Sequence, residues 1–177
     1  AAPSLHSIRP CLEGAIPAIM ATCDPDGTPN VAYISQVVYV DAAHVALSFQ
    51  FFNKTRQNIL RNPRASVLVL DPVTAHFYRL HLLYERTEDS GPVFESMRAQ
   101  LAGIASHAGM AEVFELKGAD IYAVERIESV AGEGLPAPAP RSGLLHTLRL
   151  CSESIARCSG LDELLQGALQ GLQDKLG

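Results

Sequence analysis

One stretch of the chain gathers side chains that bind anions. Residues 48–72 hold four bases, and no acidic residue lies between Asp41 and Asp71. These bases are Lys54, Arg56, Arg61 and Arg64. The whole chain is acidic, with a formal net charge of -5, so this window differs from its surroundings. Its composition predicts a site for an anionic group, and the alternative is a solvated helix face.

The order of residues in this window favours a phosphate. Residues 45–51 read as a strand, residues 53–62 have helical composition, and Asn53 suits the N-cap. A helix N-terminus carries unpaired N–H groups and a partial positive charge, so bases are unfavourable there unless an anion neutralises them. The first turn offers an amide, a hydroxyl and two cations, from Asn53, Thr55, Lys54 and Arg56. We therefore expect a phosphate site.

The elements around this turn predict a mainly β protein. We expect strands at 15–23, 30–40, 45–51, 65–71, 73–86 and 119–130, and helices at 53–62 and 90–109. Asp26-Gly27 is a strong turn signal between the first two strands. The order has no regular βαβ alternation, which disfavours a parallel doubly wound sheet. A six-stranded antiparallel barrel with flanking helices fits it better.

The chain divides into three parts by composition. Residues 1–130 form the barrel, and the Pro/Ala-rich residues 131–142 form a semi-rigid linker. Residues 143–177 carry two short amphipathic helices, which cannot bury their apolar stripes alone. We expect this helical segment to be the truncated start of another domain and to pair with a second copy.

Bulk properties exclude several classes of protein. With 177 residues, 47% hydrophobic and 19% charged, the chain suits a globular domain. No apolar run approaches the roughly 18 residues of a membrane span, and the acidic balance argues against nucleic-acid binding. The four cysteines lack zinc-site spacing, so we expect no metal site, reduced thiols and a cytoplasmic location. They are Cys11, Cys23, Cys151 and Cys158.

Three segments together resemble a known family. They are "DPDGTPNVAYIS", "ALSFQFFNKTRQNILRNPRASVLVLDP" and "FYRLHLLYER". Their order resembles the FMN-binding split-barrel family related to pyridoxamine 5'-phosphate oxidase, over about residues 10–130. The resemblance implies a homodimer of six-stranded split barrels with two FMN sites at the subunit interface.

The resemblance also implies which residues bind FMN. Asn53, Lys54 and Thr55 match the turn that holds the phosphate, and Arg56 is a neighbour that assists. Ser48 and Phe49 lie just before this turn. The strand whose backbone follows the flavin ring corresponds to Ala32, Tyr33, Ile34 and Ser35. Arg79 corresponds to a flavin contact from the other subunit.

The chain departs from the family's oxidases in ways that bear on function. These oxidases place an Arg and a Lys near the positions of Ala32 and Val37, whereas residues 29–40 contain no base. The chain also has no Trp and no Arg-x-His in its last strand. We therefore expect a flavin-dependent oxidoreductase of unknown small-molecule substrate, with unknown catalytic residues, and not a true pyridoxamine phosphate oxidase.

Two alternatives to an enzyme remain open. The first is a sensory or regulatory module that binds flavin or haem without turnover; His76 or His81 would then be an axial ligand. The second is a structural dimer with an empty pocket. The tail, "LLHTLRLCSESIARCSGLDELLQGALQGLQDKLG", resembles the opening helices of a GAF sensory domain, which favours the first alternative.

Overall fold

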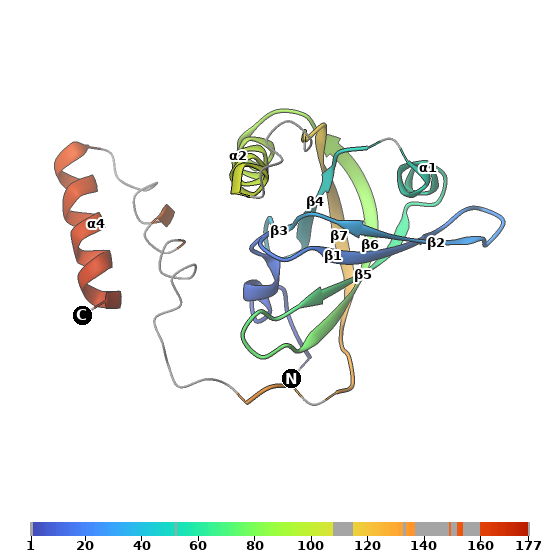
Figure 1. The fold of residues 1–177 in the computed structure, drawn as a ribbon, viewed down its shortest axis with the longest axis horizontal. Coiled ribbons are helices and arrows are strands. Elements are labelled where there is room, and N and C mark those ends of the chain that lie inside the picture. The colour runs from blue at the N-terminus through green and yellow to red at the C-terminus, as the bar shows by residue number, and fades with distance from the viewer. Residues whose placement is uncertain are drawn as a thin grey trace. The chain divides into compact units, whose positions relative to one another are not determined.

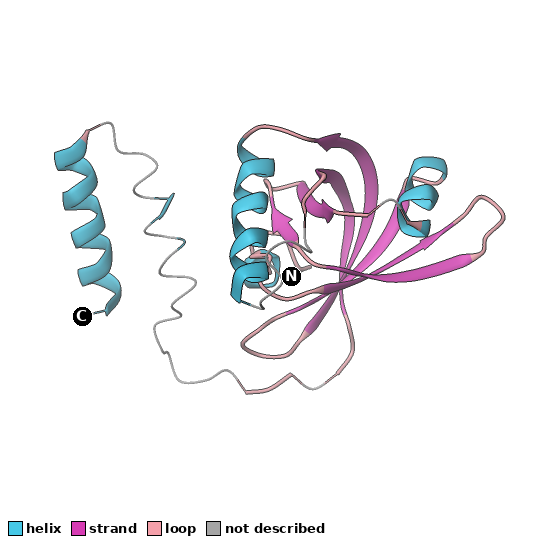
Figure 2. Ribbon diagram, turned by 45° about the horizontal axis from the view of Figure 1, so that its top comes forward, coloured by secondary structure: helices cyan, strands magenta, loops and turns pink. Residues whose placement is uncertain are grey.

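The fold of the chain is that of a computed structural model. It describes residues 2–51, 53–107, 115–132, 134–136, 149, 152–153 and 160–176. The chain divides into two compact units, Ala1–Pro136 and Ala137–Gly177. Figures 1 and 2 show that strands dominate the first unit.

Seven strands in the described part of the chain form one antiparallel sheet. They are β1 (Ala18–Cys23), β2 (Pro29–Ile34), β3 (Val37–Tyr39), β4 (His44–Phe49), β5 (Arg64–Leu70), β6 (Phe77–Glu88) and β7 (Gly118–Ser129). Their order across the sheet is β2-β1-β5-β6-β7-β4-β3. The helices of this unit are the 3-10 helix η1 (Arg9–Leu12), α1 (Lys54–Arg61) and α2 (Pro92–His107).

The two edges of the sheet are consecutive in the chain. The single strand expected at 30–40 is broken at Ser35 and Gln36 into β2 and β3, which lie at opposite ends of the strand order. Ile34 and Val37 are three residues apart, so they lie within about 10 Å of each other. The sheet must therefore curl until its edges meet, although no described ladder joins β2 to β3. The mainly β split barrel is confirmed, with seven strands instead of six.

The strand β4 is buried on both faces, which explains its apolar sequence. Leu47 belongs to the core inside the curled sheet, whereas Ala46 packs in a second cluster with α2. Phe94, Met97 and Leu101 form the buried stripe of α2, as expected. Ile104 was expected in this stripe, but it is 41% exposed.

Helix α1 begins and ends where its sequence indicates. Asn53 has extended backbone angles, and its side chain accepts a hydrogen bond from the N–H of Arg56 at 3.2 Å. The helix ends at Arg61, and Asn62 returns to extended geometry, as expected for a residue that precedes Pro63. The predicted N-cap is therefore confirmed.

Buried polar pairs fix α1 against the sheet. Asn30 Nδ2 donates to Thr55 Oγ1 at 2.9 Å, and Asn58 Nδ2 donates to Thr22 Oγ1 at 3.1 Å. The exposed fraction of Asn58 is 1%, so its amide must be satisfied inside the protein. These bonds hold the N-terminal turn of α1 beside β1 and β2.

The second unit contains α4 (Leu161–Leu176). Leu165 and Leu169 of this helix are exposed. The other helix expected in the tail falls mostly on residues outside the described ranges, as does part of the linker, and the GAF resemblance stays a prediction. No helix among the described residues combines the length and the apolar character that crossing a bilayer requires.

The barrel core generates a prediction about stability. Leu80 on β6 is fully buried, whereas Leu60 on α1 is 55% exposed. Leu80→Ala should lower the free energy of unfolding by about 2–5 kcal/mol, because it leaves a cavity in a packed core. Urea unfolding measures this change. Leu60→Ala is the matched control and should change stability by no more than about 0.5 kcal/mol; equal losses in the two variants would contradict the assigned core.

Candidate functional site

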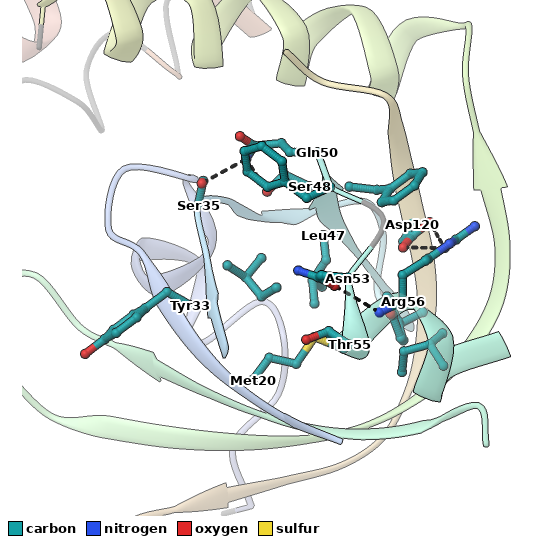
Figure 3. A pocket seen from close by; sticks show the side chains of 15 residues that line it. Met20, Tyr33, Ser35, Leu47, Ser48, Gln50, Asn53, Thr55, Arg56 and Asp120 are labelled. Atoms are coloured by element: carbon teal, nitrogen blue, oxygen red, sulfur yellow. Dashed lines mark hydrogen bonds and ion pairs between the residues drawn. The ribbon is translucent and has the colours of Figure 1, made fainter. Parts of the chain in front are cut away.

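A cavity of about 70 Å³ lies beside the break between β2 and β3. Its walls come from β1, β2, β4, β7 and α1, and Figure 3 shows the side chains that line it. The lining residues are Met20, Tyr33, Ile34, Ser35, Leu47, Ser48, Phe49, Gln50, Phe51, Asn53, Thr55, Arg56, Ile59, Asp120 and Tyr122. The curled sheet thus brings the first turn of α1 next to the end of β2.

Most of the residues that the sequence singled out gather here. The ones that line the cavity are Tyr33, Ile34, Ser35, Ser48, Phe49, Asn53, Thr55 and Arg56. Lys54 does not line it; its ammonium reaches Asp24 Oδ2 at 3.2 Å. Arg79 lies on β6, 3.7 Å from Glu128, and is not among the lining residues. Its expected contact with a flavin in another subunit remains a prediction.

A polar network holds the break in the strand. Gln50 Nε2 donates to Ser35 Oγ at 2.8 Å, and the N–H of Gln36 donates to Ser48 Oγ at 3.2 Å. The Gln36 side chain then donates to Gln100 Oε1 on α2 at 2.9 Å. Sequence reasoning missed Gln36 and Gln50. Both could have been recognised as long polar side chains within an apolar run. Such a side chain must find a hydrogen-bond partner when it is buried.

The first turn of α1 keeps hydrogen-bond donors available. Asn53 accepts from the N–H groups of both Arg56 and Gln57, through its side chain and its carbonyl. No hydrogen bond joins the N–H groups of Lys54 and Thr55 to another described residue. Because Thr55 Oγ1 accepts from Asn30, its own hydrogen is free to be donated. This turn can bind an oxyanion.

The Arg56 side chain extends to Asp120 on β7 and is held tightly there (Figure 3). Its Nη1 lies 2.7 Å from both carboxylate oxygens of Asp120, and its Nη2 donates to Thr87 Oγ1 at 2.9 Å. Thr87 and Asp120 face each other across β6 and β7, and the Thr87 hydroxyl donates to Asp120. The guanidinium also lies over the rings of Phe49 and Tyr84.

Both bases of this turn have a counter-charge within the chain, which the sequence analysis did not consider. Asp24 and Asp120 supply carboxylates from distant parts of the chain. Sequence reasoning missed Asp120. It could have been recognised as an acidic residue within the apolar run of β7, because a carboxylate that is buried there requires a cationic partner.

These two ion pairs differ in burial. The Lys54 side chain is 49% exposed and that of its partner Asp24 is 15% exposed, and an ion pair with one partner open to solvent contributes little stability. The Arg56 and Asp120 side chains are only 12% and 10% exposed. Burial raises the pKa of the Asp120 carboxyl, while the Thr87 hydroxyl and Arg56 lower it. Hydrogen bonding from the Thr28 N–H, and then from Lys54, holds the pKa of Asp24 below its ordinary value.

The histidines considered as haem ligands lie elsewhere. His76 precedes β6, and its Nε2 is 2.7 Å from Ser129 Oγ. The Nε2 of His81 is 3.1 Å from Glu128 Oε2. Neither residue lines the cavity beside α1. The described residues contain no group of three or more side chains suited to hold a metal ion.

The fold and the cavity define a split-barrel protein in which the first turn of a helix presents hydrogen-bond donors beside the split. Residues 5–131 match the pyridoxamine 5'-phosphate oxidase family, so the chain belongs to this family. No curated protein matches the chain.

Solved structures support the same fold. An FMN-binding protein from Syntrophomonas wolfei subsp. wolfei is 17% identical, with a TM-score of 0.61 over 72% of this chain and 86% of that one. HupZ from Group A Streptococcus is 20% identical, with a TM-score of 0.56 over 75% of this chain and 98% of that one. At these identities the likeness concerns the fold alone.

The buried network around Arg56 generates a prediction. Thr87→Val keeps the shape of the side chain but removes the hydroxyl that bonds Arg56, Asp120 and Tyr84. We expect the free energy of unfolding to fall by about 1–3 kcal/mol, because buried polar groups lose a partner. Chemical denaturation measures this. The exposed Thr28→Val is the matched control, and an equally small effect in both variants would argue against the network.

Proposed function

We propose that the protein binds FMN in this cavity and is a flavin-dependent oxidoreductase of unknown substrate, but not a true pyridoxamine phosphate oxidase. The observation that carries the proposal is the first turn of α1, with its available donors, next to the exposed end of β2. Membership of the pyridoxamine 5'-phosphate oxidase family supports the same ligand. The absence of Trp from the chain and of an Arg-x-His motif from its last strand argues against the oxidases' own substrate.

The residues present fit the two ends of FMN. The N–H groups of Lys54 and Thr55, the Thr55 hydroxyl and the Asn53 amide are donors for the phosphate. The Lys54 ammonium can join them, because its exposed pair with Asp24 is weak. The backbone of residues 33–35 is proposed to follow the ring. Ser48 and Phe49 form the wall behind it.

The cavity within one chain is small for such a ligand. Pockets that enclose a ligand of this size measure about 300–1,000 Å³. The edge strand β2 also carries apolar side chains that face solvent, with Tyr33 80% and Val31 66% exposed. Both observations support a homodimer in which a second copy covers the flavin ring. Arg79 is the residue proposed to reach the flavin from that copy.

The chemistry of the proposed enzyme divides between cofactor and chain. FMN supplies electron and hydride transfer when it is bound. The chain's own residues bind the phosphate, orient the ring and limit access of water. No side chain is assigned as a catalytic acid or base. A cytoplasmic location is part of the proposal and agrees with the free thiols of Cys11 and Cys23.

The second candidate is a module that binds flavin without turnover. It is favoured by the neutralisation of Arg56, which leaves the cavity with fewer free cations than the family's oxidases imply. Haem is less favoured, since His76 and His81 lie away from the cavity. Steady-state oxidation of a nicotinamide donor by the FMN-loaded protein distinguishes the two: turnover supports the enzyme, and its absence supports the module.

Titration with FMN and with riboflavin tests the phosphate site. Lys54→Ala should weaken FMN binding by about threefold to tenfold, because a charge-assisted contact to the phosphate is lost. Riboflavin binding should not change, because riboflavin has no phosphate. Quenching of flavin fluorescence measures both affinities.

Arg61→Ala is the matched control for this titration. It removes the same charge from the opposite end of the same helix and should leave both affinities unchanged. Equal weakening of FMN binding in the two variants would show that the effect of Lys54→Ala comes from the net charge of the protein and not from a contact with the phosphate. No FMN binding by the unaltered protein would refute the proposed function.

A further inference from the structure

The pair formed by Arg56 and Asp120 gives the cavity a cation that is already neutralised. The Arg56 and Asp120 side chains are only 12% and 10% exposed, and the Arg56 Nη1 is 2.7 Å from each carboxylate oxygen. Both residues line the cavity. Lys54 differs from Arg56 here, because its ion pair with Asp24 is exposed and exchangeable.

The surroundings of the guanidinium oppose its release to a ligand. Thr87 accepts from Nη2 at 2.9 Å, while the Phe49 and Tyr84 rings lie 4.4 and 5.4 Å from the guanidinium carbon. A phosphate that recruited Arg56 would leave the Asp120 carboxylate buried without its counter-charge. Breaking a buried pair in this way is costly. A phosphate would also be repelled by the carboxylate itself.

We infer that Asp120 is a specificity-determining residue: it neutralises Arg56 internally and thereby limits the preference of the site for phosphorylated over phosphate-free flavin. This inference rests on the proposed function and deepens it. The phosphate is then bound by the turn at Lys54 and Thr55, and Arg56 is a positioning residue that fixes α1 to β7. The ratio of the affinity for FMN to the affinity for riboflavin should rise when the Arg56–Asp120 pair becomes more positive and fall when it becomes more negative. The presence of Arg56 by itself should not set this ratio.

Charge variants of this pair test the inference. Asp120→Asn leaves Arg56 without a counter-charge and should raise the ratio of FMN to riboflavin affinity by about tenfold. Arg56→Gln leaves the carboxylate alone and should lower the ratio by a similar factor. The double variant, Arg56→Gln with Asp120→Asn, restores a neutral pair and should keep the ratio within about threefold of the unaltered protein.

The double variant separates this inference from a direct role of Arg56. If Arg56 bound the phosphate, the double variant would still lack that contact, so its ratio would fall by more than about threefold and the inference would be overturned. Glu125→Gln is the matched control for Asp120→Asn, because it removes a carboxylate from the exposed pair of Arg64 and Glu125. It should leave the ratio unchanged. If Asp120→Asn does not fold, the comparison of Arg56→Gln with the double variant decides whether the inference holds.

A second measurement distinguishes failure of this inference from failure of the proposed function. If the unaltered protein binds neither flavin, the proposed function fails, and inorganic phosphate becomes the probe. Thermal unfolding is then followed in phosphate and in chloride at equal ionic strength. Asp120→Asn should show a larger phosphate-dependent rise in Tm than the unaltered protein and the double variant. No such gain in Asp120→Asn would overturn the inference.

Discussion

The connection between the two edges of the sheet is the constraint on which the rest of the structure depends. Two residues, Ser35 and Gln36, join β2 at one edge to β3 at the other. A sheet with this strand order cannot stay flat, because so short a connection keeps its edges close together. The curled sheet then encloses the main core. The gap in hydrogen bonding at the same place creates the opening in which the candidate site lies.

The site is built where polar groups are needed for structural reasons. At the break, Ser35, Gln36, Ser48 and Gln50 replace the ladder that a continuous strand would have formed. At the start of α1, Asn53 accepts from the Arg56 N–H, and Asn30 donates to the Thr55 hydroxyl oxygen. Other donors of this turn have no partner among the described residues. Ser35, Ser48 and Gln50 from the first set and Asn53 from the second line the same cavity. The geometry that closes the barrel therefore also provides the donors that a phosphorylated ligand requires.

Electrostatics distinguishes the two bases in the first turn of α1. Lys54 lies outside the cavity lining, and its half-exposed ion pair can exchange the carboxylate for another anion at little cost. Around Arg56, burial, a facing Thr87 and two aromatic rings hold the charge in one place. Counting bases in the sequence treats Lys54 and Arg56 as equivalent. Their surroundings make one available to a ligand and give the other a structural role.

Features that depend on residues adjacent in the sequence could be predicted from the sequence. Asn53 caps α1, Pro63 follows its end, and Asp26-Gly27 forms a turn with Gly27 at a positive φ of 83°. These features follow from local backbone geometry and short-range hydrogen bonds. The mainly β class follows from apolar patterning along each strand.

Contacts between distant residues emerged only when the chain was folded. Asp120 reaches Arg56 because β7 lies between β6 and β4, and Asp24 reaches Lys54 because α1 packs beside β1 and β2. Nothing near residues 54–56 in the sequence indicates either carboxylate. The break at Ser35 and Gln36 could not be predicted either, because these residues lie within an apolar run that reads as one strand. Its position depends on tertiary pairing, since β2 joins one edge of the sheet and β3 joins the other. Strand order, which sets these long-range neighbours, decided which of the predicted bases is available to a ligand.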